Sequence, residues 1–178
     1  FDSSAFQLIY AGAQKNMGPA GTVMYAIDKN VLGKTGRDIP AYLDLGVHIS
    51  KDSMFNTPPV FSIFTTLLTL KWLKAKGGVA GIEKINNAKA ELIYNEIDRN
   101  PLFRGHAEES CRSTMNATFM FNDPRHTDAF DAVWAAEGIS GIKGHRSVGG
   151  YRASMYNALP IESVQVLVDV MKEFERKI

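Results

Sequence analysis

Two consecutive helical patterns, over residues 60–76 and 79–99, constrain the fold of this chain more than any other feature. The first follows Asn56-Thr57-Pro58-Pro59, where residues that often cap helices precede two prolines, a usual opening of a helix. It is apolar almost all round, so we expect it to be buried. The second carries isoleucines and leucines at helical spacing and ends before Pro101. Together they predict a helical spine between two segments that contain strands.

The segment before the helices predicts part of an α/β layer. Residues 6–11 and 22–27 are short apolar, β-favouring runs, and the loop between them, residues 12–21, is punctuated by glycine. Residues 28–32 predict a helical turn. Residues 33–55 predict a long irregular connection, and connections of such length are usually functional or disordered.

The segment after the helices predicts a small α+β domain. Apolar and polar residues alternate over 115–121, which indicates a half-buried strand, and residues 128–137 predict a helix. Strand-like pieces follow at 140–143 and 152–156. A last helix is expected to begin at Pro160 and to bury an apolar stripe that consists of Val164, Leu167, Val168, Met171 and Phe174.

Composition limits the classes of function. A chain of 178 residues buries roughly 70% of its unfolded surface and needs no disulfide or metal for a core. Twenty basic and nineteen acidic residues leave a net charge of +1, so no overall field attracts nucleic acid or an anionic membrane. Cys111, the only cysteine, excludes an internal disulfide and fits a reducing, cytoplasmic compartment. The longest apolar run, residues 60–70, is too short to span a bilayer.

Familiar metal and nucleotide motifs do not occur. The histidines at 48, 106, 126 and 145 form no HExxH motif and have no zinc-ligand spacing, so we expect no metal site. The loop over residues 12–21 fits neither the phosphate-binding loop of nucleotide hydrolases nor GxGxxG.

Lys15 is the first candidate for chemistry. In Ala13-Gln14-Lys15-Asn16 it stands between a predicted strand and a Gly-Pro-Ala-Gly turn, which holds it close to the backbone. A lysine held in this way can be desolvated and act as a nucleophile or form a Schiff base. The alternative is an ordinary solvated lysine, which is where most lysines stay.

Asn56 and Thr57 are the second candidate, because they open a predicted buried helix. Amides at a helix N-terminus, together with side-chain amide and hydroxyl donors, make a phosphate site. The alternative is a plain helix cap.

The third candidate is the glycine-flanked turn over residues 144–152, which carries His145, Arg146 and Arg152. Two guanidinium groups close together suit a ligand with two anionic ends, because arginine binds carboxylate or phosphate in a bidentate way. A pair of surface ion pairs is the alternative.

These three features, in this order, resemble the phosphoserine aminotransferases, pyridoxal-phosphate enzymes of serine biosynthesis. The resemblance covers essentially the whole chain and rests on five segments, which are IYAGAQKNMGPAG at 9–21, SMFNTPP at 53–59, KWLKAKGGVAGIEKIN at 71–86, GHRSVGGYRASMYNALP at 144–160 and EFERK at 173–177. It extends only to the C-terminal half of the enzymes of that family. Since the sequence begins with Phe1 and not Met, we expect a cut or an edge there, and 178 residues that belong to something longer.

The resemblance implies the C-terminal part of an α/β fold of the aspartate aminotransferase type. Residues 1–57 would end the large pyridoxal-phosphate domain, residues 58–100 would be connecting helices, and residues 101–178 would form the small α+β domain. It further implies a cytoplasmic homodimer with active sites at the subunit interface. The family's acidic partner of the pyridine nitrogen, its ring-stacking aromatic residue and a second phosphate loop lie in the absent half. We therefore expect this chain alone to be inactive and to hold the cofactor poorly.

The resemblance also implies roles for individual residues. Lys15 would form the internal aldimine with pyridoxal phosphate, and Gln14 would lie beside the cofactor phosphate. Asn56 and Thr57 would hold the phosphate of the cofactor bound mainly by the partner subunit. Arg152 would bind the substrate α-carboxylate, while His145 and Arg146 would help to hold the distal phosphate or carboxylate.

The reaction implied is that of 3-phosphohydroxypyruvate and glutamate to phosphoserine and 2-oxoglutarate. A related phosphohydroxythreonine substrate would connect the chain with pyridoxine biosynthesis. Two alternatives stay open from the sequence. One is a related aminotransferase that acts on a non-phosphorylated substrate, and the other is a non-catalytic oligomerisation or binding fragment in which Lys15 is merely structural.

Overall fold

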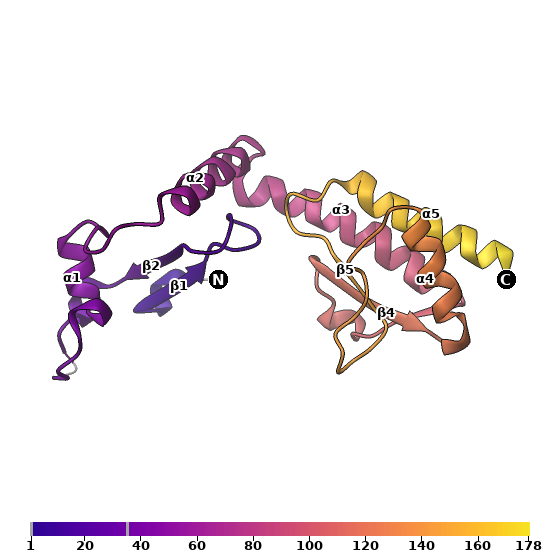
Figure 1. Cartoon of the computed structure of the whole chain (residues 1–178), viewed down its shortest axis with the longest axis horizontal. Helices are drawn as coiled ribbons and strands as arrows, with labels where there is room; N and C mark the ends of the chain where they lie inside the picture. The colour runs from indigo at the N-terminus through magenta and orange to yellow at the C-terminus, as the bar shows by residue number, and fades with distance from the viewer. Residues whose placement is uncertain (1, 35) are drawn as a thin grey trace. The chain divides into compact units, whose positions relative to one another are not determined.

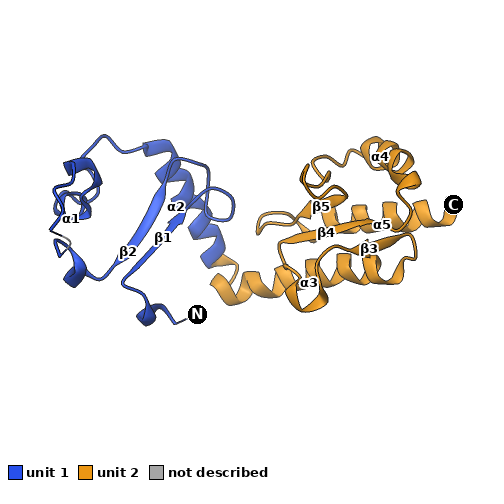
Figure 2. Ribbon diagram, turned by 90° about the horizontal axis from the view of Figure 1, so that it is seen from below, with its two compact units in different colours: residues 1–74 blue, residues 75–178 orange. Residues whose placement is uncertain are grey.

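The computed structural model describes residues 2–34 and 36–178, so that Phe1, the expected edge, and Thr35 lie outside the described residues. The chain divides into two compact units, of which the first ends at Lys74 and the second begins at Ala75 (Figure 2). The domain limits expected after residues 57 and 100 stay predictions. Within the described residues, no helix is long and apolar enough to cross a membrane.

The first unit is built on an antiparallel hairpin of β1 (Leu8–Gly12) and β2 (Val23–Ile27), as expected (Figure 1). Tyr10 lies opposite Tyr25, and their rings stack with centroids 6.3 Å apart. A two-stranded hairpin is marginally stable by itself in water. The loop that joins its strands contacts the helix that follows, through a hydrogen bond from Ser62 to Ala20.

That helix, α2 (Val60–Ala75), is exposed along most of its apolar surface, which contradicts the expectation that it is buried. Phe61 is 77% exposed and Phe64 is 56% exposed, and Thr66 is the buried residue of the helix. The apolar pattern is real, but the described residues of this chain do not cover it. An apolar surface of this kind is typical of a face that another polypeptide covers.

The connection before α2 is more ordered than expected. It contains a 3₁₀ turn, η3 (Ala41–Leu43), and a short helix, α1 (Leu45–Ser50). Asp44 caps α1, because its Oδ1 accepts a hydrogen bond of 2.8 Å from the backbone N–H of Gly46. The turn expected at 28–32 is confirmed as η2 (Lys29–Val31).

The second unit is a three-stranded antiparallel sheet with two long helices against one face (Figures 1 and 2). The strand order is β3-β4-β5, with the bounds Phe103–Gly105, Asn116–Phe121 and Tyr151–Ser154. The helices are α3 (Gly78–Arg99) and α5 (Ile161–Lys177). Both helices were expected from their apolar spacing, and the structure confirms them.

The core of the second unit is aromatic. Phe119 and Phe121 of β4 point inward with Ala117, which confirms the predicted alternation of this strand. Phe103 stacks on Phe121 with ring centroids 4.5 Å apart, and Phe130 meets both rings edge to face. Burying one such ring stabilises the fold by about 1.5–3 kcal/mol. The predicted stripe of α5 is buried throughout, from Val164 to Phe174.

The segment between α4 (Thr127–Ala136) and β5 differs from expectation, since residues 140–143 do not form a strand. Gly138 and Gly141 have φ of +75° and +72°, and these left-handed residues turn the backbone out of an extended path. What is left of the pairing is an isolated bridge between Lys143 and Tyr151. The remaining 3₁₀ turns are η1 (Ser3–Ala5), η4 (Glu109–Cys111) and η5 (Pro124–His126).

Candidate functional site

Lys15 lies in the loop between β1 and β2 with a φ of +104°. A residue other than glycine with positive φ is uncommon, and such backbone strain costs on the order of 1–3 kcal/mol, which the surroundings must balance. Two hydrogen bonds fix the conformation. Lys15 N donates to Gly18 O at 3.1 Å, and Met17 N donates to Ala13 O at 3.2 Å. The strained backbone therefore holds Lys15 at the tip of a defined loop.

The loop rests on α2. Ser62 Oγ donates a hydrogen bond of 2.9 Å to Ala20 O, which links the helix to the loop. A Cβ atom at Gly18 would lie 2.5 Å from Thr66 Oγ1 and 3.1 Å from Thr66 Cα. Only glycine at position 18 allows this close approach, so this residue places the lysine loop on the helix.

Gln14 and Lys15 both have exposed side chains, so their ends are accessible to a ligand. The Gln14 amide folds back over Gly12, where an added Cβ would lie 2.3 Å from Gln14 Oε1. The loop thus carries an exposed amine and an exposed amide on consecutive residues.

Asn56 and Thr57 line a cavity of about 480 Å³ in the same unit. They are not the cap of α2, because the helix begins at Val60 and its first hydrogen bond runs from Ile63 N to Pro59 O. The cavity is completed by the start of β2, by α1 and by the turn before α2, with the lining residues Gly21, Thr22, Val23, Tyr25, Tyr42, Leu43, Leu45, His48, Ser53, Pro58, Pro59 and Ile63. Gln14 and Lys15 do not line it, so the described unit does not bring the two groups of predicted residues into one cavity.

The third candidate, the turn before β5, lies in the second unit. Gly144 N donates to Gly150 O at 2.8 Å, and Gly149 N donates to His145 O at 2.8 Å. A Cβ atom at Gly144 would lie 2.0 Å from Gly149 O, so the tight closure requires glycine there. The turn therefore has a defined conformation that displays His145 and Arg146.

His145 and Arg152 line a common small cavity of about 90 Å³, which Arg146 does not line. Arg152 projects from the open face of the sheet, because its neighbours Tyr151 and Ala153 are buried on the other face. His145 Nδ1 accepts a hydrogen bond of 3.3 Å from Ser147 N and lies 2.8 Å from Ser147 Oγ. The ring therefore contacts its own turn through Nδ1.

A buried lysine, Lys89, escaped the sequence analysis. It is 0% exposed, and its Nζ donates to the backbone oxygens of Met155, Tyr156 and Leu159 at 2.9–3.2 Å. Burial lowers the pKa of this amine. Its partners lie 66–70 residues away in the sequence, so no local pattern could have indicated it.

Arg112, which no motif singles out, is partly buried in a polar cluster. Its guanidinium donates to both carboxylate oxygens of Asp98 at 2.6 and 2.7 Å and lies 4.7 Å from the ring centroid of Tyr94. These hydrogen bonds lower the pKa of the Asp98 carboxyl. The cluster joins α3 to the segment before β4.

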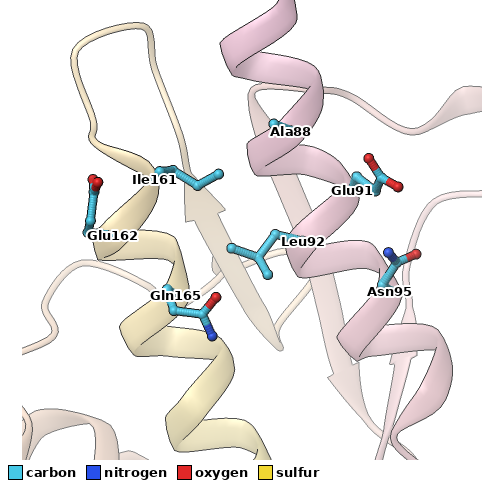
Figure 3. A pocket seen from close by; sticks show the side chains of 7 residues that line it. All are labelled: Ala88, Glu91, Leu92, Asn95, Ile161, Glu162 and Gln165. Atoms are coloured by element: carbon cyan, nitrogen blue, oxygen red, sulfur yellow. The ribbon is translucent and has the colours of Figure 1, made fainter.

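A groove of about 460 Å³ lies between α3 and α5 of the second unit (Figure 3). Leu92 and Ile161 project into the space between the two helices, whereas Glu91 and Glu162 point away from it on the outer sides of α3 and α5. None of the predicted site residues lines it. Over residues 2–34 and 36–178, no group of three or more His, Cys, Asp or Glu residues could hold a metal ion.

Comparison with known proteins accounts for this combination of elements. The sequence profile of the family described as aminotransferase class-V matches residues 1–167. The chain belongs to the class-V aminotransferase family.

Proteins similar to this class-V aminotransferase chain are named phosphoserine aminotransferases. The protein of Flavobacterium johnsoniae is 64% identical over 177 residues, and that of Flavobacterium psychrophilum is 67% identical over 177 residues. Each alignment covers 99% of this chain and 50% of the relative. The chain therefore spans about half the length of the relatives it matches.

Solved structures confirm the expected fold of this class-V aminotransferase chain as part of an aminotransferase fold. The phosphoserine aminotransferase of Bacillus circulans subsp. alkalophilus is 40% identical, with a TM-score of 0.92 over 99% of this chain and 49% of that one. The enzyme of Trichomonas vaginalis, described as PLP-bound, is 35% identical, with a TM-score of 0.83 over 95% of this chain and 48% of that one. An alanine–glyoxylate aminotransferase from Nostoc, at 18% identity and a TM-score of 0.70, shares the fold alone.

Proposed function

We propose that this chain contributes to a pyridoxal-phosphate-dependent transaminase, which moves the amino group between glutamate and 3-phosphohydroxypyruvate to give phosphoserine and 2-oxoglutarate. The observation that carries the proposal is Lys15, held at a φ of +104° on a loop that Gly18 seats against α2. Strained backbone of this kind clusters at active sites. The names of the relatives supply the substrate class.

The residues of the first unit fit pyridoxal phosphate. Lys15 offers an exposed primary amine, the group that binds the aldehyde of this cofactor. Asn56 and Thr57 offer an amide and a hydroxyl at one cavity, and Thr22 Oγ1 beside them is buried without a hydrogen-bond partner among the described residues. Such neutral donors suit phosphate oxygens, and Gln14 adds a further amide next to Lys15.

When bound, pyridoxal phosphate supplies an electron sink for the substrate α-carbon. Lys15 Nζ would take the proton from that carbon and would later give a proton back, so one amine would serve as general base and then as general acid. The hydrogen bonds of the loop set the backbone position from which this amine extends before the substrate arrives.

The second unit supplies the groups for anionic substrates. Arg152 binds the α-carboxylate that all four substrates and products share, in a bidentate way. His145 and Arg146 hold the distal phosphate or carboxylate. A cationic turn that accepts either anion lets donor and acceptor use one pocket in succession.

Assembly and compartment complete the proposal. We infer a homodimer in which Asn56 and Thr57 serve the cofactor of the partner subunit, since they do not share a cavity with Lys15. The exposed apolar face of α2 supports an assembly with further polypeptide. The exposed free thiol of Cys111 suits a reducing compartment such as the cytoplasm.

Steady-state kinetics of the full-length protein test the substrate. With glutamate as donor, we expect turnover of 3-phosphohydroxypyruvate with a kcat/KM well above that for glyoxylate. Equal or higher kcat/KM with glyoxylate would replace the proposal by an aminotransferase for non-phosphorylated substrates. Absence of any transaminase activity would favour a non-catalytic binding module.

Two arginine variants test the assignment of the turn. Arg152→Ala removes the ligand of the shared α-carboxylate, so KM should rise for glutamate and for 3-phosphohydroxypyruvate alike. Arg146→Ala should change the ratio of kcat/KM between phosphorylated and non-phosphorylated acceptors. An unchanged ratio would remove Arg146 from the distal site.

A further inference from the structure

We propose that Asp131 is a positioning residue for substrate binding, because it ties both ends of the turn that carries His145 and Arg146 to helix α4. The proposal rests on the function assigned to that turn above. It assigns no contact between Asp131 and substrate.

The contacts of Asp131 converge on the base of the turn. Its Oδ2 lies 2.8 Å from Lys143 Nζ, and its Oδ1 accepts a hydrogen bond of 2.9 Å from the Tyr151 hydroxyl. Lys143 and Tyr151 are the paired residues of the isolated bridge that closes the turn. Directly opposed residues of an antiparallel pair project to the same face, so one carboxylate reaches both.

The carboxylate itself is fixed. Asp131 is only 18% exposed in its side chain, and Trp134 Nε1, one helical turn along α4, donates a third hydrogen bond of 3.0 Å to its Oδ1. Asp131 therefore approaches the turn from a helix whose own residues Phe130 and Trp134 are buried in the core.

Tyr151, which donates a hydrogen bond to Asp131, is itself held in place by the core. Its ring is 3% exposed, stacks on Phe119 at 5.2 Å between centroids and meets Phe130 edge to face at 5.3 Å. Burial and the neighbouring Asp131 raise the pKa of the hydroxyl, so it stays a donor.

We call Asp131, Lys143 and Tyr151 together the clamp. Its two residues at the base of the turn are adjacent in sequence to the binding residues. Lys143 precedes His145 by two residues, and Tyr151 directly precedes Arg152. The backbone around them is paired as well, because Arg152 N donates to Ile142 O and Gly144 N donates to Gly150 O. Loosening the clamp should therefore move His145 and Arg152 against one another while the core beneath stays intact.

Two variants of the full-length protein each remove one of the contacts to Asp131, and the Tyr151 hydroxyl also lies 3.4 Å from Thr127 O. Tyr151→Phe keeps the buried ring and removes the hydroxyl, and Lys143→Met keeps the length of the side chain and removes the charge. We expect Tyr151→Phe to raise KM for both substrates about fivefold. Lys143→Met, whose side chain is 70% exposed, should raise it about two- to fivefold, and kcat should stay within about twofold of wild type in both variants. Amide hydrogen exchange over residues 144–150 should accelerate, while that of α5 stays unchanged. Lys143→Arg should restore KM.

Matched controls make the same chemical changes elsewhere in the second unit. Tyr94→Phe removes a hydroxyl that donates to Ser113 O at 3.1 Å, and Lys177→Met removes an ion pair of 2.7 Å with Glu173. Neither residue contacts the turn, so KM should remain at the wild-type value. A rise in KM equal to that of Tyr151→Phe would show a general loss of stability and overturn the proposal.

Unchanged KM in both clamp variants, or exchange that accelerates equally in α5, also overturns it. Failure of the proposed function has a different signature, since wild type itself would then lack turnover. In that event the exchange measurement, which needs no substrate, decides alone whether Asp131 holds the turn.

Discussion

The substitution Gly18→Ala probes how the lysine loop is seated on α2. The new Cβ would lie 2.5 Å from Thr66 Oγ1, which can rotate, and 3.1 Å from Thr66 Cα, which cannot. Because a backbone atom is involved, the loop has to move away from the helix. Overpacking of this kind costs about 1–3 kcal/mol, which corresponds to about a 5- to 150-fold change in an equilibrium constant.

Amide hydrogen exchange of residues 13–22 in the full-length protein measures that change directly. We expect exchange of the loop to accelerate by this factor in Gly18→Ala, because the loop opens more often. Gly33→Ala is the control, since its Cβ would meet nothing within 4 Å and its φ of +71° makes the substitution strained without a contact to the lysine loop. It should leave exchange of the loop at the wild-type rate.

A second substitution tests whether Thr66 is the cause. Thr66→Ala removes the hydroxyl that the new methyl group would meet, so the double variant should recover a large part of the loss. Wild-type exchange in Gly18→Ala would refute the seating of the loop on α2. A double variant no better than Gly18→Ala would refute the role of Thr66.

Further predictions concern the second unit. Lys89→Met leaves three buried backbone oxygens without their donor and should lower the free energy of unfolding by about 1–3 kcal/mol. The control Lys84→Met changes an exposed lysine and should alter the free energy of unfolding by no more than about 0.5 kcal/mol. Equal urea midpoints of the two variants would contradict the buried role of Lys89. Hydrogen bonds from Arg112 lower the pKa of Asp98 from 3.8, so the unfolded chain binds this proton more readily. The stabilisation is present above about pH 4 and is lost as the pH falls towards the folded pKa, and it amounts to at most about 1 kcal/mol because the carboxylate is half exposed. The free energy of unfolding of Asp98→Asn should therefore be lower than that of wild type near neutral pH and approach it in acid. A difference in this free energy that does not depend on pH would exclude the Asp98–Arg112 pair as its source.

Regular elements with a periodic apolar pattern could be predicted from the sequence. The inward residues of β4 and the apolar stripe of α5 are buried in the same core, so local pattern and tertiary packing agree there. The glycine-rich loop around Lys15 was also predicted, because glycine and proline mark turns independently of what surrounds them.

The differences arise where the tertiary environment decides. The apolar pattern of α2 could not show that the described residues leave Phe61 and Phe64 exposed. The alternative of a plain helix cap at Asn56 and Thr57 is wrong, since two prolines follow these residues and the helix starts only at Val60.

Long-range polar contacts could not be predicted from the sequence for a related reason. Lys89 has no local sign of burial, because the carbonyl oxygens that receive its hydrogen bonds come from the connection between β5 and α5. Asp131 likewise resembles any acidic residue on a helix until the fold brings Lys143 and Tyr151 to it. Candidate binding residues could be named from motifs, whereas the groups that hold them in place required the structure.

The central claim is that Lys15 is the lysine that binds pyridoxal phosphate. Borohydride reduction of the full-length protein with the cofactor, followed by peptide mass spectrometry, measures it directly. We expect the reduced cofactor on the peptide that contains Lys15 and its loss in Lys15→Ala, with the exposed Lys29→Ala as a control that keeps the label. A label on a different lysine, or one that persists in Lys15→Ala, would contradict it.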